Sequence, residues 1–559
     1  MDISIQVLLK QVKRNNSSNN IDLIKKAYDF ANKKHENQYR KSGEPYIIHP
    51  INVAYNLATW GMDTPSICAG LLHDVVEDTS ATYQDIQVGF GEEIAQIVDG
   101  VTKLADAFSD LEEKQTKNYT KLFGAMEKDI RVIIVKLADR LHNIQTLTYL
   151  RPDRQLAIAT ETIELYAPIA HKLGMHDVQI QLQDEAFKYV HPEEYKFITE
   201  KFEKLKEKNK ENLDNTVKIL KQFLKKQRIP ALTNLEYKHL YNIYIKMKEK
   251  NIDISQIQDL FAIKIIVKQK RECYRILGAL NTQFRTIPKS FRDYVAIPRN
   301  NNYQALQEII FGEKGCIVEA QICTYEMNKM SKYGITNYFR YFKANGEENF
   351  ENNLSGIKDT LELEDLINNP KEFLKTLKEE LIGKETYVFT PKGEIKVLPK
   401  DAVVLDFAYA IHNDIGNNIS GCMINSKYMP ITTKLRNGDI VQIITSKDGI
   451  TPEKEWLDIV KTAKAKIHIV KRLKETQKTI QNVNLDIFIK KLGDISLNGI
   501  ISEVTEIFTK NNINMESFEV NMEDGIKIHI TLEQIYLPKL DEVIKELAEK
   551  NQIEKINKY

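Results

Sequence analysis

The sequence has no excess of either charge, few cysteines and no long apolar run. Its 559 residues carry 79 basic and 78 acidic side chains, which leaves a net charge of +1. This balance argues against a protein that coats a polyanion, although local basic patches remain compatible with it. The five cysteines show no CxxC spacing and no even framework. We therefore expect reduced thiols rather than disulfides or a thiolate metal site.

Segments that insert into membranes are also missing. No stretch approaches the ~20 apolar residues that a membrane-spanning helix needs. The opening residues, MDISIQVLLKQVKRNN, lack the apolar run of a secretory signal. We therefore expect a soluble, cytoplasmic protein without a membrane partner. The length predicts about three to five domains.

The stretch Leu71–Asp78, LLHDVVED, holds one histidine and three carboxylates among apolar residues. If it is helical, His73 and Glu77 are spaced i, i+4, and so are Asp74 and Asp78, so the four polar groups share one side. The leucines and valines then face the core. Because uncompensated charge is costly among apolar neighbours, this pattern indicates half of a metal site.

Two further segments carry matching donors. His49 lies in YIIHP, where we expect Pro50 to end the local hydrogen-bond ladder. Asp139 lies in VKLADRLHN, a predicted helix on which Asp139, Asn143 and Thr146 are spaced i, i+4, i+7. Two imidazoles and two carboxylates suit a divalent first-row ion such as manganese better than a thiolate-type zinc site. The predicted ligands are His49, His73, Asp74 and Asp139.

A loop between two predicted helices, Ile21–Lys34 and Ile51–Trp60, supplies adjacent cations. Arg40 and Lys41 stand there, followed by Ser42 and a glycine. Two neighbouring cations are more often solvated than bound. Their place shortly before a predicted metal ligand favours contact with phosphate groups instead.

Four long strings in this region resemble the HD hydrolase domain of the RelA/SpoT homologue enzymes, which make and destroy the alarmone (p)ppGpp. The resemblance covers residues 22–195 and implies a manganese-dependent hydrolase, over residues 1–200, that removes the 3′-pyrophosphate of guanosine tetra- or pentaphosphate. The matching strings are YRKSGEPYIIHP (Tyr39–Pro50), GLLHDVVEDT (Gly70–Thr79), FGEEIAQIVDGVTKL (Phe90–Leu104) and IVKLADRLHNIQTL (Ile134–Leu147).

The resemblance also suggests roles for the side chains around the metal. Glu77 and Asp78 are expected to orient the attacking water or to carry its proton. Arg140, next to Asp139, is either a further site residue or a structural ion-pair partner. The residues expected to hold the nucleotide are Arg40, Lys41, Ser42, Asn143 and Thr146.

A lysine-rich amphipathic run, Phe197–Arg228, predicts a helix that links two domains over residues 201–229. Residues 230–345 then mix strands and helices: a strand over Asp259–Val267, a helix over Glu272–Phe284 and a strand over Cys316–Ile322. This α/β segment resembles the family's synthetase domain, a nucleotidyltransferase-like fold that moves pyrophosphate from ATP to the 3′-OH of GDP or GTP. A helical linker is expected over residues 346–383.

The synthetase resemblance is incomplete where it matters for catalysis. The family's motif Gly-Arg-Pro-Lys-His reads Leu-Glu-Tyr-Lys-His at residues 235–239, so Glu236 stands in place of an arginine that grips ATP phosphates. A carboxylate there reverses the sign of the interaction. Other family cations are replaced as well, by Lys264, Gln307, Cys323, Asn328 and Asn337.

Several synthetase positions do survive. Asp259 and Glu319 could still hold magnesium, and Tyr303 could still stack a guanine. Because each lost charge-assisted phosphate contact is worth about 1.5–3 kcal/mol, we expect a folded but catalytically inactive synthetase domain. The surviving positions are Lys246, Asp259, Arg292, Arg299, Tyr303 and Glu319.

Residues 384–447 read as a small β-rich module. YVFTPKGEIKVLP predicts a hairpin with Lys392-Gly393 at its turn. The module resembles the β-grasp-like TGS domain of the same enzymes, in which the histidine that matches His412 lies near the tRNA acceptor end on the ribosome. The resemblance therefore implies the ribosome, tRNA or another regulatory protein as a partner.

A basic helical segment is expected over residues 448–483. The full-length family continues with a cysteine- and histidine-rich region, and no such cluster occurs in this sequence. Residues 484–559 predict the order βαββαβ, which resembles an ACT domain and implies a small effector or self-association. Its predicted elements are a strand, a helix (Gly499–Asn511), two strands (Met515–Asn521 and Ile526–Leu532), a helix (Pro538–Asn551) and a last strand.

The expected fold is therefore multidomain α plus α/β, with an all-helical HD domain, a nucleotidyltransferase-like domain, a TGS domain and an ACT domain. The expected function is (p)ppGpp hydrolysis. Three alternatives stay open: a bifunctional synthetase and hydrolase, a non-catalytic alarmone sensor that acts through TGS and ACT, and an HD phosphohydrolase for other nucleotides. An intact HD residue set speaks against the sensor, and the YRKSG loop with three attached domains speaks against the last.

Overall fold

The computed structural model describes two compact units, Met1–Glu385 and Thr386–Tyr559. It describes the chain outside residues 1–2, 17, 103–119, 127, 300, 338–358, 361, 364–365, 367–372, 374, 378, 380, 382, 384, 447–451, 490–495, 522–525, 534–535, 550–552 and 559, and only the backbone of 475–483, 533 and 538. The helical linker expected over 346–383 lies largely outside the described residues.

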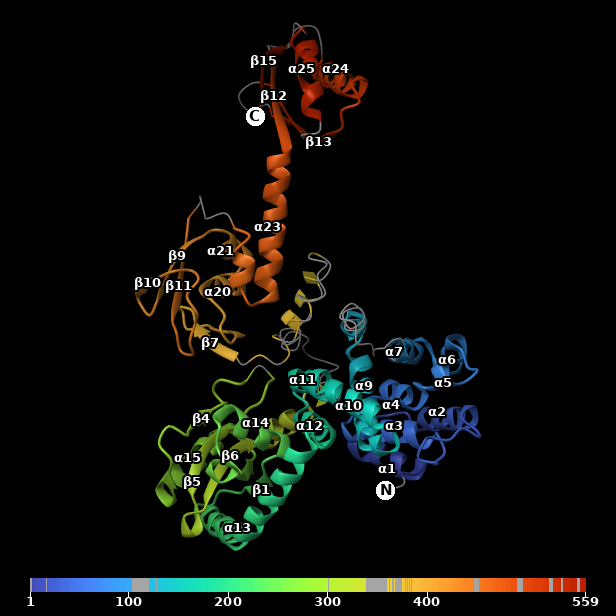
Figure 1. Ribbon diagram of the computed structural model, residues 1–559, viewed down its shortest axis with the longest axis vertical. Helices are drawn as coiled ribbons and strands as arrows, with labels where there is room; N and C mark the ends of the chain where they lie inside the picture. The colour runs from blue at the N-terminus through green and yellow to red at the C-terminus, as the bar shows by residue number, and fades with distance from the viewer. Residues whose placement is uncertain are drawn as a thin grey trace. The chain divides into compact units, whose positions relative to one another are not determined.

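The first unit opens with a helical bundle, drawn from blue to teal in Figure 1. Its described residues before 227 form no strand, as expected for this part of the chain. One apolar core runs through these helices, from Leu8 in the first to Leu182 in the last. The helices are α1 (Ile5–Asn15), α2 (Ile21–Lys34), α3 (Ile48–Thr59), α4 (Thr64–Leu72), α5 (Val75–Asp78), α6 (Tyr83–Phe90), α7 (Glu92–Thr102), α9 (Ile130–Gln145), the 3₁₀ turn η1 (Leu147–Tyr149), α10 (Pro152–Glu161), the π-helical turn η2 (Thr162–Tyr166), α11 (Ala167–Lys172) and α12 (His176–Val190).

Side-chain caps decide where several of these helices begin. Asn20 accepts from Leu23 N at the start of α2, and Asp63 does the same for Ser66 N at the start of α4. Helix α3 begins at Ile48, so Pro50 sits in its first turn. The expectation that Pro50 ends a hydrogen-bond ladder is therefore wrong, because an amide in the first turn has no intrahelical partner to lose.

The stretch LLHDVVED is not one continuous helix, which corrects the sequence-based expectation. Helix α4 ends at Leu72 and α5 begins at Val75, with His73 and Asp74 in the turn between them. Nδ1 of His73 lies 3.0 Å from the Gly70 carbonyl oxygen, which in an unbroken helix would accept from the Asp74 N–H. Both turn residues keep right-handed helical dihedrals, so their side chains stay close together.

A second core forms around a mixed sheet. The 35-residue helix α13 (Pro192–Lys226) buries Phe202, Leu213 and Leu220 in that core, so it is packed into the sheet domain rather than standing free as a linker. The sheet has the order β1-β2-β6-β5-β3, in which β2 and β6 are parallel and β1–β2 and β5–β6 antiparallel, and β4 also pairs with β5. The α/β expectation for residues 230–345 is confirmed. The elements are β1 (Leu232–Tyr237), α14 (Leu240–Lys250), η3 (Ile254–Gln256), β2 (Phe261–Val267), α15 (Lys270–Gln283), β3 (Arg285–Thr286), β4 (Arg292–Asp293), β5 (Leu306–Phe311), η4 (Glu313–Gly315), β6 (Ile317–Thr324) and α16 (Tyr325–Tyr333).

The segment after α16 joins the sheet domain to the helical bundle. The Ile335 amide donates to the Leu173 carbonyl at 3.0 Å, and Oγ1 of Thr336 donates to the Trp60 carbonyl at 3.0 Å. Gly334 has φ +51°, and a Cβ there would lie 2.1 Å from the Leu173 carbonyl oxygen. Only glycine allows the two backbones to approach this closely.

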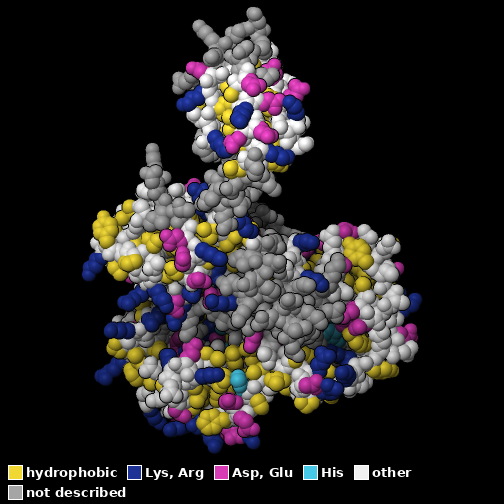
Figure 2. Space-filling model, turned by 45° about the horizontal axis from the view of Figure 1, so that its top comes forward, with side chains coloured by type: hydrophobic (Ala, Val, Ile, Leu, Met, Phe, Trp, Pro, Cys, Tyr) yellow, Lys and Arg dark blue, Asp and Glu magenta, His cyan; other side chains and the backbone are white. Residues whose placement is uncertain are grey.

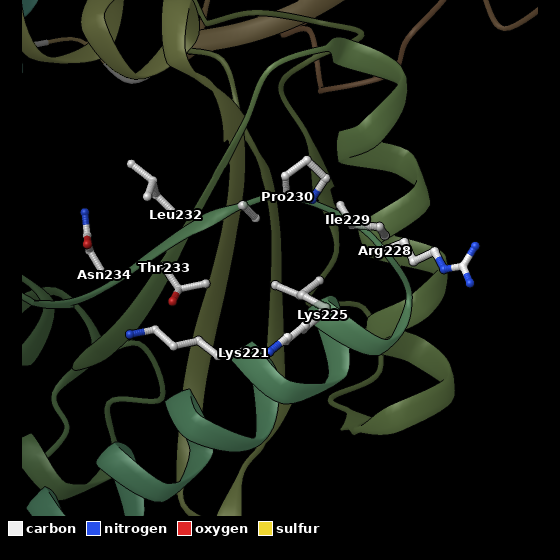
Figure 3. Close-up of a pocket in the computed structure, with 10 residues that line it drawn as sticks. Lys221, Lys225, Arg228, Ile229, Pro230, Leu232, Thr233 and Asn234 are labelled. Carbon is white, nitrogen blue, oxygen red and sulfur yellow. The ribbon is translucent and has the colours of Figure 1, made fainter.

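A groove of about 690 Å³ lies at the start of β1, where α13 ends (Figure 3). Lys221 and Lys225 line the groove from α13, and Thr233 and Asn234 line it from β1. The groove is thus a feature of the sheet domain's edge strand.

The second unit contains two small sheets and a βαββαβ domain. The predicted hairpin is confirmed, with its turn at Gly393, whose φ is +82°. The C-terminal sheet has the order β13-β14-β12-β15, all antiparallel, with α24 and α25 packed on it, so the predicted βαββαβ order is confirmed. The elements are β7 (Glu385–Phe389), β8 (Ile395–Pro399), α20 (Val404–Ile411), α21 (Asn413–Asn417), β9 (Ile419–Ile424), β10 (Lys427–Met429), β11 (Val441–Thr445), α22 (Trp456–Ile459), α23 (Ala463–Gln481), β12 (Asn482–Ile489), α24 (Leu497–Lys510), β13 (Met515–Asn521), β14 (Ile526–Glu533), α25 (Leu537–Ala548) and β15 (Ile553–Lys558).

The surface of the C-terminal domain carries charges of both signs, in keeping with the balanced composition of the chain. On the face of the C-terminal domain in Figure 2, Lys and Arg side chains alternate with Asp and Glu, without a large patch of one sign. Among the described residues, no helix is long and apolar enough to cross a membrane.

Candidate metal centre

Helices α3, α4 and α9 bring the predicted ligands together. Nε2 of His49 lies 3.3 Å from Nε2 of His73. Asp74, in the turn after α4, places Oδ2 3.4 Å from His49 Nε2 and Oδ1 3.1 Å from His73 Nε2. Asp139, on α9, places Oδ1 3.2 Å from His49 Nε2 and 3.9 Å from His73 Nε2. Three helices therefore present four donor groups to one point in space.

The outer nitrogen of each imidazole is already engaged. Nδ1 of His73 lies 3.0 Å from the Gly70 carbonyl oxygen, to which it donates. Nδ1 of His49 lies 2.8 Å from Nδ1 of His142. With the proton of each ring on Nδ1, both Nε2 lone pairs face the other candidate metal ligands, as in metal-binding histidines.

Asp139 is held ionised despite being buried. Burial by itself would raise the pKa of its carboxyl group, but Lys136 Nζ at 2.9 Å and the nearby His49 ring hold that pKa well below its usual value. Oδ1 also accepts from Asn143 Nδ2 at 2.6 Å. Lys136 neutralises Oδ2, so Oδ1 stays available to a ligand on the histidine side.

These residues fit a divalent ion. Three of them, His49, His73 and Asp74, place ligand atoms within 4.8 Å of one another, and Asp139 contacts both imidazoles. Two imidazoles and two carboxylates match the donor set that first-row divalent metals use. The hydrogen bonds behind the two imidazoles are the support that such ligands usually have.

The two expected proton carriers lie at the outer side of this cluster. Oδ2 of Asp78 accepts from the Tyr46 hydroxyl at 2.6 Å, and the same hydroxyl lies 2.9 Å from Asp74 Oδ2. Glu77 is exposed on α5, and partial desolvation of its carboxyl group, together with the charges of Asp74 and Asp78, raises the pKa of that group. Both carboxylates are thus placed to face solvent beside the cluster.

The expected nucleotide-binding residues partly converge on the same place. Arg40 donates from Nη2 to Asn143 Oδ1 at 3.0 Å, and its Nη1 lies 3.2 Å from His142 Nδ1. Lys41 is exposed in the same loop, and Ser42 donates to Glu44 at 3.1 Å. Thr146, at the end of α9, donates to the His142 carbonyl.

Sequence reasoning missed two residues of this cluster, Tyr46 and His142. Each lies three positions from a predicted ligand, in YIIHP and in the ADRLH segment, and that i, i+3 spacing was the available signal. Burial, His49 and Arg40 lower the pKa of His142 to about 3, so this ring is neutral.

Arg140 has a structural role, which settles one of the open alternatives. Its Nη2 lies 2.6 Å from Oε2 of Glu161, and its guanidinium group lies 4.3 Å from the centre of the Tyr166 ring. All three side chains are buried. Arg140 therefore ties α9 to α10 and the π-helical turn instead of facing the donor cluster.

A second cavity, of about 840 Å³, lies between the bundle helices α11–α12 and the sheet domain. Arg292 lies outside its lining and donates to the carbonyls of Lys289 and Phe291. The hydroxyl of Tyr303 accepts from Gln307 at 2.9 Å. The surviving synthetase residues that line the cavity are Lys246, Asp259, Arg299, Tyr303 and Glu319.

Charged groups in this cavity neutralise one another. Lys264 Nζ lies 2.8 Å from Glu236 Oε2, so two of the residues that depart from the synthetase pattern form an ion pair. Lys238 and Lys246 both contact Asp259 Oδ2. Burial would raise the pKa of Asp259, but these two lysines lower it to about 2.

Comparison with known proteins yields three family matches in the order expected. The HD domain matches residues 27–176, a region found in RelA/SpoT proteins matches 236–346, and the TGS domain matches 386–445. An HD domain, a RelA/SpoT region and a TGS domain are therefore present.

Individual proteins are also similar to this chain. A protein of Myxococcus xanthus named GTP pyrophosphokinase is 40% identical over 463 residues, which make up 82% of this chain and 61% of the relative. The Haemophilus influenzae protein named guanosine-3′,5′-bis(diphosphate) 3′-pyrophosphohydrolase is 37% identical over 528 residues, 94% of this chain and 74% of the relative. A solved metazoan SpoT orthologue, described as hydrolysing ppGpp, is 27% identical over 30% of this chain and 94% of its own, with a TM-score of 0.25.

The chain spans 61% to 66% of the length of three curated relatives that it matches, and 74% of the Haemophilus protein. Three domain matches in one order and 37% identity across nearly the whole chain leave one conclusion. The chain belongs to the RelA/SpoT homologue family.

Proposed function

We propose that this protein is a manganese-dependent (p)ppGpp 3′-pyrophosphohydrolase that yields GDP or GTP and pyrophosphate. The observation that carries the proposal is the convergence of His49, His73, Asp74 and Asp139 beside the Arg40–Asn143 contact. A metal-binding cluster flanked by a cation is the arrangement that phosphate ester hydrolysis needs. Names of relatives include this activity.

The residues divide the work in a simple way. When bound, the divalent ion supplies Lewis acidity that activates water and offsets negative charge on the phosphoryl group. Arg40 and Lys41 lie in one loop and attract the phosphates, while Asn143 holds the Arg40 guanidinium in place. Ser42, in this loop, and Thr146, at the end of α9, are also proposed to contact the nucleotide.

Asp78 and Glu77 handle the proton. As water forms a bond to the phosphorus on the ribose 3′-oxygen, a proton leaves the water, and the bond to the 3′-oxygen breaks. Asp78 or Glu77 receives that proton and returns it to the departing 3′-oxygen, which becomes the ribose 3′-hydroxyl as pyrophosphate leaves. Transfer of a proton from the attacking water is costly unless an acceptor is already aligned with that water. The position of the two carboxylates beside the cluster supplies this alignment.

We further propose that the RelA/SpoT region is an inactive synthetase. Two observations favour this over the bifunctional alternative. Glu236 pairs with Lys264, so neither is free to bind the phosphates of ATP, and Asp259 is held by Lys238 and Lys246. Phosphoryl transfer depends mainly on positioning and charge stabilisation, and both are impaired.

The second unit is proposed to serve regulation in the cytoplasm. Its TGS domain, with His412 exposed at the end of α20, is assigned to contacts with the ribosome, tRNA or a regulatory protein. The βαββαβ domain is proposed to be an ACT domain that binds a small effector or a second copy. A sensor without catalysis stays the alternative if the hydrolase assay fails.

Purified protein assayed with ppGpp, with and without Mn²⁺, tests the proposal. Wild type plus Mn²⁺ is expected to release pyrophosphate, while His73→Ala and Asp74→Asn are expected to be inactive yet folded, since each removes one ligand. Circular dichroism and metal analysis provide the controls. Activity above a few per cent in either variant, with normal metal content, would reject the ligand assignment.

A further inference from the structure

Tyr46 lies between two carboxylates of the candidate site. Its hydroxyl oxygen is 2.6 Å from Asp78 Oδ2 and 2.9 Å from Asp74 Oδ2. One of these residues is a proposed metal ligand and the other a proposed proton carrier. A single phenol group therefore connects the two functions of the site.

The Tyr46 ring is itself held in place from several sides. It stacks on the His35 ring, with centroids 4.6 Å apart and planes 20° apart. Its amide donates to the Gln38 carbonyl at 2.9 Å, and its carbonyl accepts from the His49 amide at 2.9 Å. The two backbone bonds fix the position of the Tyr46 backbone, and the phenol cannot swing away from the carboxylates without losing its stacking on His35.

The same segment also holds the backbone at Asp78. Nε2 of Gln38 donates to the Asp78 carbonyl at 2.9 Å, and Oε1 of Gln38 lies 2.7 Å from Nδ1 of His35. Within the described residues, Tyr46 is the one hydrogen-bond donor to the Asp78 carboxylate. Asp78 is therefore held through its side chain by Tyr46 and through its backbone by Gln38.

A phenol has one proton to donate, and here two acceptors share it. Such sharing draws the Asp74 and Asp78 carboxylates toward one hydroxyl group and opposes the repulsion between their like charges. The Asp74–Tyr46–Asp78 link is a support for the ligand set of the kind that ordinarily tunes metal sites.

We propose that Tyr46 is a positioning residue that places the Asp78 carboxylate beside the metal site and holds Asp74 in its ligand orientation. This inference rests on the proposed hydrolase function for its kinetic consequences. Its consequence for metal binding stands apart from that function. Among the described residues, the hydrogen-bond and ring partners of the Tyr46 side chain are Asp74, Asp78, His35 and His49 and include none of the proposed nucleotide-binding residues, so its loss should leave substrate affinity unchanged.

Tyr46→Phe isolates the hydroxyl, because the ring and its stacking on His35 remain. Tyr39→Phe is the matched control, since it removes a hydroxyl from an exposed tyrosine in the same loop. We expect Tyr46→Phe to lower kcat for ppGpp by about 10–100-fold, to leave KM within twofold and to weaken Mn²⁺ binding, measured by electron paramagnetic resonance with the metal alone, by about tenfold. Tyr39→Phe should match wild type in all three.

A double-mutant cycle with Asp78→Asn separates positioning from a general structural role. If Tyr46 acts through Asp78, adding Tyr46→Phe to Asp78→Asn should lower kcat by less than threefold further. Additive losses, a raised KM with normal kcat, or unchanged kcat and Mn²⁺ affinity in Tyr46→Phe would each overturn the proposal. If Tyr46→Phe fails to fold, Asp78→Asn with unchanged kcat overturns it instead. Wild type that binds Mn²⁺ but leaves ppGpp intact would reject the hydrolase function, and the Mn²⁺ titration would still decide the role of Tyr46.

Discussion

Arg40 and Asn143 are 103 positions apart in the sequence, yet Nη2 of the first lies 3.0 Å from Oδ1 of the second. Asn143 in turn donates to Asp139 at 2.6 Å. The amide therefore joins the cationic loop before α3 to a proposed metal ligand on α9. The proposed phosphate-binding and metal-binding residues are thus joined by one short hydrogen-bonded path.

Loss of Arg40 should weaken substrate binding more than catalysis. A charge-assisted contact of this kind is worth about 1.5–3 kcal/mol, so Arg40→Ala is expected to raise KM for ppGpp about 10–100-fold, with kcat within about fivefold. Steady-state kinetics with saturating Mn²⁺ measures both. Lys33→Ala, an exposed cation on α2, is the control and should behave as wild type. A large fall in kcat with unchanged KM would move Arg40 into the chemical step.

Silencing the hydrolase should reveal no synthesis. Asp74→Asn protein is expected to form no (p)ppGpp from ATP and GDP or GTP, because Glu236 faces Lys264 where a phosphate-binding cation is needed. Glu236→Arg alone should not restore synthesis, since it sets two cations against each other. Chromatography of labelled nucleotides, with added pppGpp to prove recovery, gives the readout. Product above a no-enzyme control would establish a bifunctional enzyme.

Substitution of Gly334 should loosen the joint between the bundle and the sheet domain. A Cβ at this φ of +51° meets the Leu173 carbonyl oxygen at 2.1 Å, so Gly334→Ala is expected to lower the free energy of unfolding by at least about 2 kcal/mol. Gly278→Ala is the control, because a Cβ there meets nothing within 4 Å and it lies inside α15. Urea unfolding compares them. Equal stability of the two variants would contradict the close backbone contact.

Acid should destabilise the first unit partly through His176. Burial lowers the pKa of this imidazole to about 4, although its Nδ1 lies 3.2 Å from Gln179 Oε1. The unfolded chain takes up a proton near pH 6.5, where the folded chain does not, so the contribution is complete above pH 6.5 and is lost as pH falls toward 4. The loss is on the order of 3 kcal/mol.

His176→Gln is expected to reduce the slope of unfolding free energy against pH between 4 and 6.5. Urea unfolding at several pH values measures that slope. Between pH 7.5 and 8.5 both proteins carry a neutral side chain at this position, so their difference should be constant there. An unchanged slope in the acid range would show that folding does not lower the pKa of His176 below its value in the unfolded chain.

Much of the fold follows from local sequence patterns. The helix Ile21–Lys34 and the strand Met515–Asn521 were predicted at their observed bounds, because caps, apolar periodicity and turn residues act over a few positions. The βαββαβ order could likewise be read along the chain. The metal ligands could be proposed because their residue types and apolar surroundings leave few other uses.

Contacts between segments that are far apart in the chain could not be predicted from the sequence. The break at His73–Asp74 arises because a side chain takes up a backbone carbonyl, a competition that helical spacing does not register. The role of Arg140 depended on Glu161 and Tyr166, which reach it only after α10 folds back on α9.

The sequence by itself determined which side chains are able to bind a metal, attract a phosphate or move a proton, because those capacities follow from side-chain type. The tertiary structure alone decided which of them meet. Tyr46 touches Asp74 and Asp78, and His142 touches His49 and Arg40, because three helices converge there. The contacts of Tyr46 join residues 28 and 32 positions apart, and those of His142 join residues 93 and 102 positions apart, so they depend on packing between segments that no local pattern encodes.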